Sequence, residues 1–374
     1  MPSAFPMTLA AWLHDLNPFV LRISQDFGIR WYGVAYAVGF LLAWAQLRWL
    51  ARRGASRLSE PRVADAMATL IFGVLLGGRL GYCLVYDPAL LTLVTDHFPF
   101  WGVLMINKGG MAFHGAVVGV IIASWQIARG PRDDSGLRSQ RMPWLHVLDL
   151  TAFAAPAGLM LGRIANFVNG ELLGQVVAMP GKPAPWWAVK YPQEIGSEHI
   201  HDPSTFYTPE QLQKLQELVA KFTPRGGTFD DGVVRMMQAL QDHSSSAGGG
   251  HAQLVASLSP LVSARHPSQL YQAFVEGPVL ALFLWIIWRR PRLPGIVGCW
   301  FLILYGILRA IIEQFFRLPD PQLVHQRILG LSRGQWLSLA MVAFGAGFIA
   351  VISARAKKNA GAVRLGGWGA QSAG

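Results

Sequence analysis

The chain has 374 residues, of which 52% are hydrophobic and 14% are charged, and it contains 14 tryptophans. Average soluble chains carry about 25% charged residues, so this composition argues against an ordinary soluble domain and favours a protein that faces lipid. The net charge of +11 does not indicate nucleic-acid binding, because the basic residues lie in short tracts between apolar runs instead of forming one basic face.

Seven apolar segments are long enough to cross a bilayer core, which takes about 20 residues of helix. The fourth is the weakest of them, because it contains Pro156 and ends in polar residues. The sequence therefore predicts an all-α integral membrane protein with seven transmembrane helices. The expected spans are 33–50, 63–86, 111–128, 147–168, 268–288, 295–316 and 335–354.

The basic residues predict the orientation, because Lys and Arg accumulate in cytoplasmic loops. If the N-terminus lies outside and the C-terminus inside, most of the Lys and Arg residues in the loops lie on the inner side and few lie in the short outer segments. The inner set is Arg48, Arg52, Arg53, Arg57, Arg62, Arg129, Arg132, Arg138, Arg141, Arg289, Arg290, Arg292, Arg355, Lys357, Lys358 and Arg364, and the outer set is Arg22, Arg30, Lys108, Arg327 and Arg333.

A long outer segment separates the fourth and fifth helices. It contains TPEQLQKLQELVAKF, which reads as an amphipathic helix with Thr208 as N-cap and Pro209 as its first residue. A weaker helix around 231–242 and the flexible stretch HSSSAGGGH follow. The predicted domains are 1–174 (outer N-terminal segment and helices one to four), 175–267 (an extracytoplasmic head), 268–354 (helices five to seven) and 355–374 (a basic cytoplasmic tail, expected to be disordered).

Several polar residues lie inside the expected spans or at their ends, where ionisable groups mark sites or pathways by default. Three arginines occupy the later halves of helices that run outward, and further polar groups occupy the early ends of helices that run inward. All of them fall in the outer half of the bilayer. The set is Arg79, Arg163 and Arg309, together with Trp31, Tyr32, His114, Arg265, His266 and Tyr271.

Helical spacing groups some of these residues. Tyr305, Arg309 and Glu313 are four residues apart and share one helix face, and Arg163 neighbours Asn166 one turn on. Guanidinium groups bind phosphate or carboxylate oxygens bidentately and stay charged at any depth. Such a cluster predicts an anion site at the outer leaflet, and a phospholipid headgroup is the simplest ligand.

Small residues accompany these polar groups. Gly73, Gly77 and Gly81 form a small-xxx-small stripe beside Arg79, which predicts a close approach of a second helix. Gly115 and Gly119 after His114 predict the same.

Simpler interpretations stand beside the site hypothesis. Arg309 and Glu313 can neutralise each other across one helix turn, and Arg79 and Arg317 can extend to the interface without binding anything. His114 alone is more typical of a helix-end histidine than of a base.

Other residues have ordinary explanations as well. Trp31, Tyr32 and Tyr271 are compatible with an interfacial aromatic belt. Asp149, at the inner end of the fourth helix, is expected to cap that helix. Cys83 and Cys299 lie in apolar runs, so a disulfide is not expected, and neither has metal-ligand spacing.

Two classes of function fit these observations: an intramembrane enzyme acting on a phospholipid, and a multi-pass transporter or flippase of an anionic lipid or solute. A transporter is expected to show paired repeats and broken helices near the midplane. The sequence shows neither clearly, and its polar residues lie at one depth, which favours the enzyme.

The stretch GRIANFVNGELLG, residues 162–174, resembles the G-R-x-x-N-F-x-N-G-E-x-x-G motif of bacterial prolipoprotein diacylglyceryl transferases. RWYGVAYAVGF, GGRLGYCLVYD, MAFHGAVVG, RHPSQLYQAFVEG and ILRAIIEQFFR resemble other motifs of that family, in the same order. The resemblance covers nearly the whole chain except the head, and the family has the seven-helix, N-out topology that the charges predict.

The resemblance implies transfer of the sn-1,2-diacylglyceryl group of phosphatidylglycerol to the lipobox cysteine thiol in a prolipoprotein signal peptide. A thioether forms and glycerol phosphate is released, which is the first step of bacterial lipoprotein maturation. The implied location is the bacterial inner membrane, with the active site toward the outer leaflet. No metal or diffusible cofactor is implied.

The resemblance also assigns roles. Arg163 and Arg309 are expected to hold the phosphate as negative charge develops, and His114 is the candidate base for the thiol, with Glu313 or water as the alternative. The remaining residues expected to bind substrate are Tyr32, Arg79, Asn166, Asn169, Gly170, Glu171, Gly174, Arg265, His266, Tyr271, Tyr305 and Glu313.

Two features depart from the family pattern. The usual H-G-G run is HGA here, with Ala116 in the second glycine position, which puts a tight backbone approach there in question. The outer head is also longer than is usual for the family, and catalysis does not explain its length.

Overall fold

The structure is a computed structural model, and it describes residues 11–23, 28–96, 99–105, 109–131, 140–196, 206–242, 250–318, 328–359 and 361–368. Most of the flexible stretch predicted before His251 lies outside these residues, as do Lys108, Arg132, Arg138 and Arg327 of the charge pattern.

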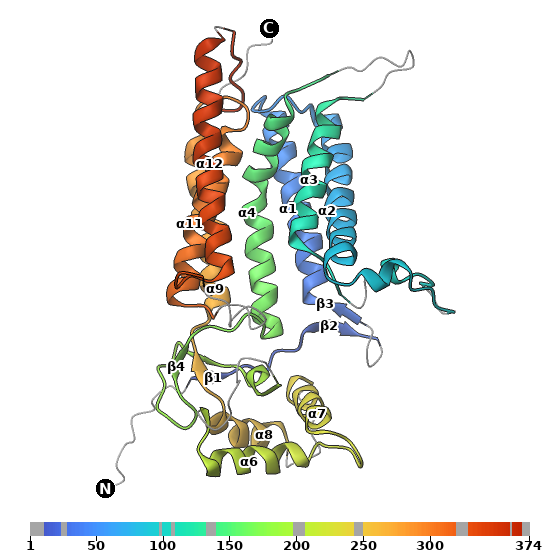
Figure 1. The fold of residues 1–374 in the computed structure, drawn as a ribbon, viewed down its shortest axis with the longest axis vertical. Helices are drawn as coiled ribbons and strands as arrows, with labels where there is room; N and C mark the ends of the chain where they lie inside the picture. The colour runs from blue at the N-terminus through green and yellow to red at the C-terminus, as the bar shows by residue number, and fades with distance from the viewer. Residues whose placement is uncertain are drawn as a thin grey trace. The chain divides into compact units, whose positions relative to one another are not determined.

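Helices dominate the described residues, and six stretches are long and apolar enough to cross a membrane (Figure 1). One of them joins α9, a π-helical turn and α10. The stretches are α1 (Trp31–Arg52), α2 with the 3-10 turn before it (Glu60–Val85), α4 (Trp144–Asn169), α9–α10 (Ser268–Phe274 and Leu280–Trp288), α11 (Ile296–Phe315) and α12 (Arg333–Lys358).

The third predicted span is a shorter helix, α3 (Phe113–Ala128), of 16 residues. Two prolines fall inside the spans and act differently. Helix α4 continues through Pro156, whereas Pro278 lies in a π-helical turn, Val275–Val279, between α9 and α10. Proline lacks the N–H that an α-helical turn requires, and a local π adjustment is one way to absorb the loss.

The chain forms two compact units. The first comprises Met1–Ala35, Met160–Val275 and Gly306–Leu339, and the second comprises Tyr36–Leu159, Glu276–Tyr305 and Ala340–Gly374.

In the second unit, α2 and α3 touch backbone to backbone. A Cβ on Gly73 would lie 2.6 Å from the carbonyl oxygen of Gly119, and Gly77 faces Gly115 in the same way. The predicted close approach is therefore confirmed for this helix pair. Ala116 fits because it lies opposite Gly78, where even an added Cβ would stand 3.7 Å from the methyl group of Ala116.

Asp149 of this unit caps a helix other than its own. Its carboxylate accepts hydrogen bonds from the backbone N–H groups of Gly295 and Gly298, each at 2.7 Å, at the start of α11. The prediction that Asp149 caps α4 was wrong, because Asp149 caps α11 instead. The physical reason is the expected one, since a helix N-terminus stabilises a carboxylate.

Part of the tail that the sequence predicts to be disordered, residues 361–368, makes defined contacts. The backbones of Leu365 and Arg292 exchange hydrogen bonds of 2.7 and 2.8 Å, and the ring of Trp368 lies 5.1 Å from that of Trp49. Residues 361–368 therefore pack against the second unit instead of extending from it.

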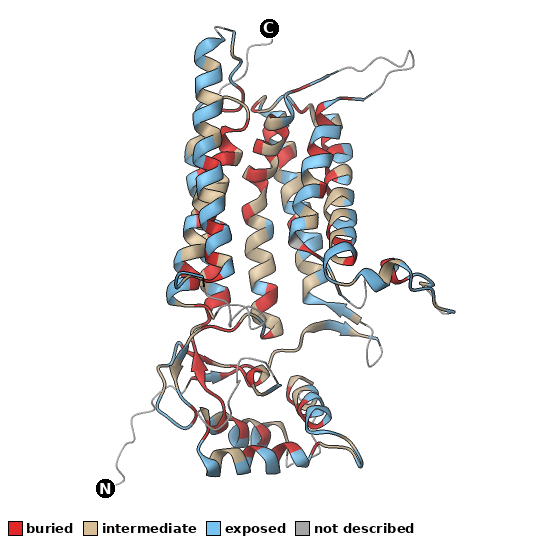
Figure 2. Ribbon diagram, in the orientation of Figure 1, coloured by how far each residue is buried: buried red, intermediate tan, exposed pale blue. Residues whose placement is uncertain are grey.

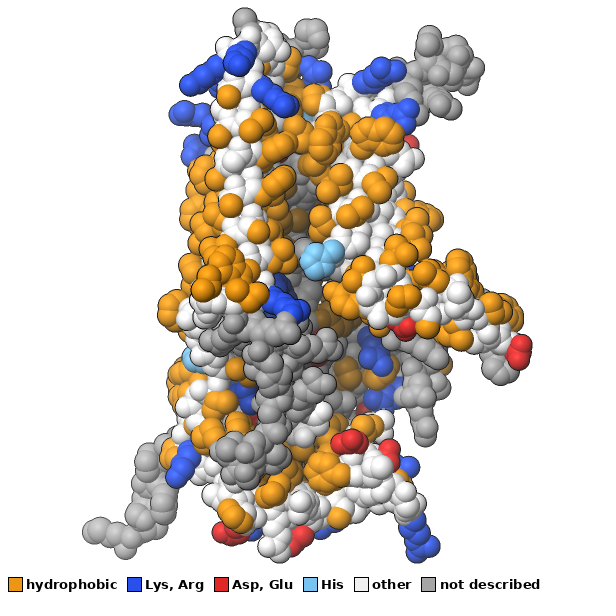
Figure 3. Space-filling view, viewed as in Figure 1, with side chains coloured by type: hydrophobic (Ala, Val, Ile, Leu, Met, Phe, Trp, Pro, Cys, Tyr) orange, Lys and Arg blue, Asp and Glu red, His pale blue; other side chains and the backbone are white. Residues whose placement is uncertain are grey.

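Apolar side chains cover the helices of the second unit, and Lys and Arg gather at one end of them (Figure 3). Phe72 and Leu84, both on α2, are 74% and 63% exposed. Such surfaces are typical of helices that face lipid.

In the first unit, short strands and three helices form a small globular part, which we call the head. It contains strands β1 (Trp12–Leu13), β4 (Val176–Ala178), β5 (Val189–Lys190) and β6 (Ala264–Arg265), and helices α6 (Pro209–Ala220), α7 (Phe229–Gln241) and α8 (His251–Leu258). A separate hairpin pairs β2 (Phe19–Arg22) with β3 (Gly28–Arg30).

The head sheet has the order β1-β5-β6-β4, in which β1 and β5 are parallel and the other neighbours antiparallel. An entirely helical fold was therefore not a complete description. Helix α6 begins as predicted: the Thr208 hydroxyl accepts from the Gln211 N–H at 3.2 Å, and the Gln211 amide oxygen accepts from the Thr208 N–H at 2.9 Å, which is a capping box.

The head has a buried apolar core. Val219 of α6, Met236 of α7 and Leu258 of α8 are completely buried and belong to one cluster, and buried residues line the inner faces of these helices (Figure 2). The strands β5 and β6 contribute to separate small apolar clusters, Val189 with Leu173 and Tyr191, and Ala264 with Ala11 and Ala188.

Candidate active site

A polar cluster surrounds the carboxylate of Glu171, just beyond the end of α4. It accepts hydrogen bonds from the Tyr32 hydroxyl at 3.1 Å and from the amides of Asn166 and Asn169, each at 3.2 Å. The Asn166 amide also donates to the Tyr32 hydroxyl. Four of the predicted site residues therefore lie together, and Glu171 itself is exposed.

Glycine shapes the turn that presents Glu171. Gly170 has a φ of +67°, and its N–H bonds to the carbonyl of Phe167 while the Glu171 N–H bonds to that of Asn166, both at 3.0 Å. This pair of bonds is a Schellman motif, which favours glycine at the left-handed position. A Cβ on Gly174 would overlap the carbonyl oxygen of His266, so glycine is needed there for a close backbone approach.

The two principal arginines occupy different helices of the first unit. Arg163 lies on α4, one turn before Asn166, and Arg309 lies on α11; both are partly buried. Their joint contact with a phosphate stays a prediction.

Glu313 lies on α11, one turn after Arg309, and is buried against the first turn of α12. It accepts a hydrogen bond from the Ser332 hydroxyl, and a Cβ on Gly334 would lie 2.6 Å from its carboxylate. Glu313 therefore joins α11 to the start of α12, and its pairing with Arg309 and its role as an alternative base stay predictions.

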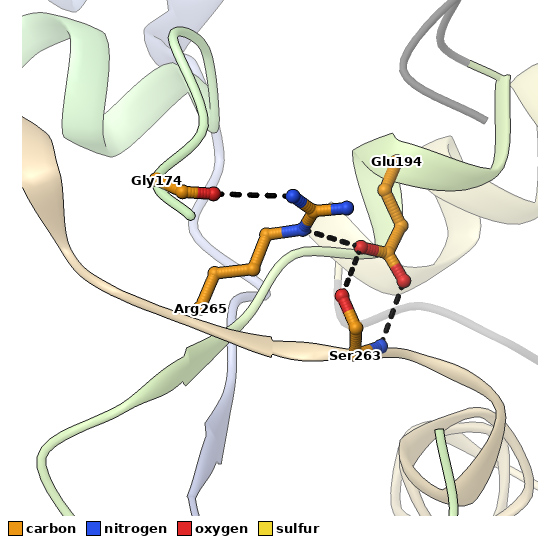
Figure 4. Close-up of polar contacts among 4 residues, drawn as sticks. All are labelled: Gly174, Glu194, Ser263 and Arg265. Carbon is orange, nitrogen blue, oxygen red and sulfur yellow. Dashed lines mark hydrogen bonds and ion pairs between the residues drawn. The ribbon is translucent and has the colours of Figure 1, made fainter. Parts of the chain in front are cut away.

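The residues of the RHPSQLY stretch, which begins at Arg265, are closely packed by their neighbours. Arg265 is 1% exposed and bonds to Glu194 and to the carbonyl of Gly174 (Figure 4). The His266 ring stacks on Trp187 at 5.1 Å and touches Phe316; burial lowers the pKa of this histidine.

Tyr271 completes this aromatic group, with its ring 5.3 Å from that of Phe316. These contacts favour structural roles for Arg265, His266 and Tyr271, whose direct binding of substrate stays a prediction.

Three predicted residues belong to the second unit. His114 lies exposed in the first turn of α3, and Tyr305 is buried with its ring stacked on Phe301 at 5.7 Å. Arg79 is buried and donates to the carbonyls of Gly102, Val103, Gly109 and Gly110 at 2.7 to 3.0 Å. These contacts favour a role in holding the segment that follows α2.

Sequence reasoning missed Glu194, Ser268 and Gln269, which fix the residues around Glu171. Glu194 lies in a short 3-10 turn, Pro192–Gly196, and its surrounding sequence gave no signal. Ser268 and Gln269 belong to a motif that was noted, but their bonds go to backbone carbonyls, which leave no pattern in sequence. Among the described residues, no group of three or more His, Cys, Asp or Glu could hold a metal ion.

Six long apolar helices among the described residues, with a polar cluster at the end of one of them, define a multi-pass membrane protein. Residues 18–351 match the family model described as prolipoprotein diacylglyceryl transferase. The chain belongs to this family and is a transferase.

Curated relatives span nearly the same length. The phosphatidylglycerol–prolipoprotein diacylglyceryl transferase of Bdellovibrio bacteriovorus is 40% identical over 365 residues, covering 95% of this chain and 97% of that protein. Proteins of the same name from Ruegeria pomeroyi and Polaromonas naphthalenivorans are 35% and 32% identical, covering 90% and 88% of this chain and 95% and 93% of theirs.

Proposed function

We propose that this chain transfers the sn-1,2-diacylglyceryl group of phosphatidylglycerol to the lipobox cysteine thiol of a prolipoprotein. The name of its relatives, which gives phosphatidylglycerol, prolipoprotein and the diacylglyceryl group, supports this proposal. A sulfur–carbon bond forms at the glyceryl carbon, the carbon–oxygen bond to phosphate breaks, and glycerol phosphate leaves. The thiol proton goes to a base.

The proposed setting is the bacterial inner membrane, with seven crossings, the N-terminus outside and the site toward the outer leaflet. Helix α3 supplies the seventh crossing. The charges support this orientation, because Arg48, Arg62, Arg129 and Arg292 lie at the ends of α1, α2, α3 and α10 in the second unit. The proposed extracytoplasmic head between the fourth and fifth helices (175–267) follows from the same topology.

Each step has a candidate residue. Arg163 and Arg309 stabilise the charge that grows on the leaving phosphate. An ordinary cysteine thiol has a pKa of about 8.5, so a base assists its ionisation; His114 is the first candidate and Glu313 the alternative. The hydroxyl of Tyr32 and the amides around Glu171 shape the headgroup pocket.

The observation that carries this proposal is a cluster at the end of α4, in which Tyr32 of α1 meets Asn166, Asn169 and Glu171 of the stretch that carries the family motif. A structural helix end does not require three amide or hydroxyl groups around one exposed carboxylate.

The direct experiment follows labelled glycerol from phosphatidylglycerol to a synthetic lipobox peptide. Arg163→Ala is expected to reduce transfer by about 100- to 1,000-fold while the protein still inserts into membranes. Arg290→Ala is the matched control, because Arg290 is exposed next to the end of α10, and it should transfer at the normal rate. Normal transfer by both Arg163→Ala and His114→Ala would overturn the site assignment.

Transport is tested separately. Purified protein in liposomes should not move glycerol phosphate across the bilayer when no thiol acceptor is present. Flux without an acceptor would favour a transporter.

A further inference from the structure

Every backbone carbonyl of the loop that follows α4, residues 171–175, is fixed by a hydrogen bond. Five successive backbone oxygens each accept a hydrogen bond from another segment of the first unit. The pairs are Glu171 with the Gln269 amide (2.5 Å), Leu172 with the Ser268 hydroxyl (3.2 Å), Leu173 with the Leu318 N–H (3.1 Å), Gly174 with the Arg265 guanidinium (3.1 Å) and Gln175 with the His266 N–H (3.1 Å).

The backbone of this loop needs such support. Leu172 has a φ of +57°, which is unfavourable for a residue with a Cβ. External hydrogen bonds on both sides of Leu172 therefore hold a conformation that the loop would not favour on its own.

A charged group of the head fixes one of these donors. Glu194 is completely buried and accepts from the Ser263 N–H at 2.7 Å, from the Ser263 hydroxyl at 2.5 Å and from Arg265 Nε at 2.7 Å. Arg265, also buried, points its other end at the carbonyl of Gly174 (Figure 4). The chain of contacts thus runs from the head to the loop that carries Glu171.

We infer that Glu194 is a positioning residue for the transferase reaction: it orients Arg265, and Arg265 fixes the 171–175 loop and with it the carboxylate of Glu171. This inference rests on the proposed function and assigns the head a part in catalysis. Two fully buried, oppositely charged groups that are also hydrogen-bonded to Ser263 and to the carbonyl of Gly174 form a rigid pair, which suits the orientation of a distant side chain.

The first test compares Glu194→Gln with the unchanged protein in the glycerol-transfer assay. Glutamine keeps the shape but removes the charge that orients Arg265. Because small misplacements of reacting groups are costly, kcat is expected to fall by about 10- to 100-fold, with KM for the lipobox peptide within about threefold. Glu194→Asp, which keeps the charge, is expected to recover part of the loss.

The matched control is Leu258→Ala, a change at a fully buried position of the head core, whose buried cluster includes no residue of the 171–175 loop. It should lower the thermal unfolding midpoint at least as much as Glu194→Gln while kcat stays within about twofold. Equal losses of kcat in the two variants would mean that Glu194 acts only through head stability, and would overturn the inference.

A double-mutant cycle tests the route through Glu171. If Glu194 acts through Glu171, then Glu194→Gln should change the residual rate of Glu171→Gln by less than about twofold, because coupled residues are non-additive. Fully additive losses would contradict that route. Absence of transfer in the unchanged protein would instead overturn the proposed function, so the two failures are distinguishable.

Discussion

The head of the first unit and the α2–α3 pair of the second unit are stabilised in different ways. The head buries Val219, Met236 and Leu258 in an apolar core, as a soluble domain does. The α2–α3 pair instead touches through glycine backbones, while large apolar side chains such as Phe72 point outward. In water, burial of apolar area drives association; between helices in lipid, close packing of small residues replaces it.

Matched leucine truncations give the largest contrast between the two regions. Leu258→Ala in the head core is expected to destabilise the head by about 2–5 kcal/mol, whereas Leu84→Ala, 63% exposed on α2, should change stability by less than about 0.5 kcal/mol. Hydrogen exchange of α6–α8 and of α2 in lipid nanodiscs measures both effects. Similar losses at the two positions would mean that the outer face of α2 is packed.

Glycine substitutions test the close approach of α2 and α3. Gly77→Ala places a methyl group against the backbone of Gly115 and should destabilise the α2–α3 pair by about 1–3 kcal/mol. Gly347→Ala on α12 meets no described atom within 4 Å and should be neutral or slightly stabilising, because alanine has the better helix propensity. Thermal unfolding in detergent compares the two variants; a Gly77→Ala protein as stable as the unchanged one would refute the close approach.

A helix cap tests a smaller contribution in the head. Thr208→Ala removes the hydrogen bond that the Thr208 hydroxyl accepts from the Gln211 N–H at the start of α6 and should cost about 1 kcal/mol. Thr208→Ser keeps the hydroxyl and serves as the control. Protection of the first turn of α6 against hydrogen exchange should fall for alanine and persist for serine.

The spans were predictable and the site only in part. Hydropathy located the apolar helices, and the motif in 162–174 predicted that Asn166, Asn169 and Glu171 belong to one site. The head strands were missed because each has only two or three residues, too few for a period of two to show. The partner of Asp149 lies 146 positions away at Gly295, and local spacing carries no information about such a contact.

The pH dependence of the head should be the smallest effect. His14 is completely buried, and its Nε2 lies 2.7 Å from the carbonyl of Phe167 while Nδ1 faces the Gln193 amide at 3.2 Å. Burial lowers the pKa of His14, although Phe167 and Asp15 partly oppose the change. The folded state therefore binds its proton less readily than the unfolded state.

The contribution of His14 to the free energy of unfolding of the head should consequently be fully present above about pH 6.5. It should decrease as the pH drops below 6.5, by about 1 kcal/mol or less per pH unit. His14→Gln should reduce this slope, with a remainder from His266, whose pKa burial also lowers. Hydrogen exchange of the head at pH 7.5 and 5.5 measures the slope, and an identical slope in His14→Gln would exclude His14 as its source.

The docked residues 361–368 have a practical consequence for protein engineering. Removing them would strip Arg292 of its backbone partner and leave Trp49 without the ring of Trp368 beside it. Affinity tags and fluorescent fusions are therefore better appended through a linker beyond residue 374 than substituted for the last residues of the chain.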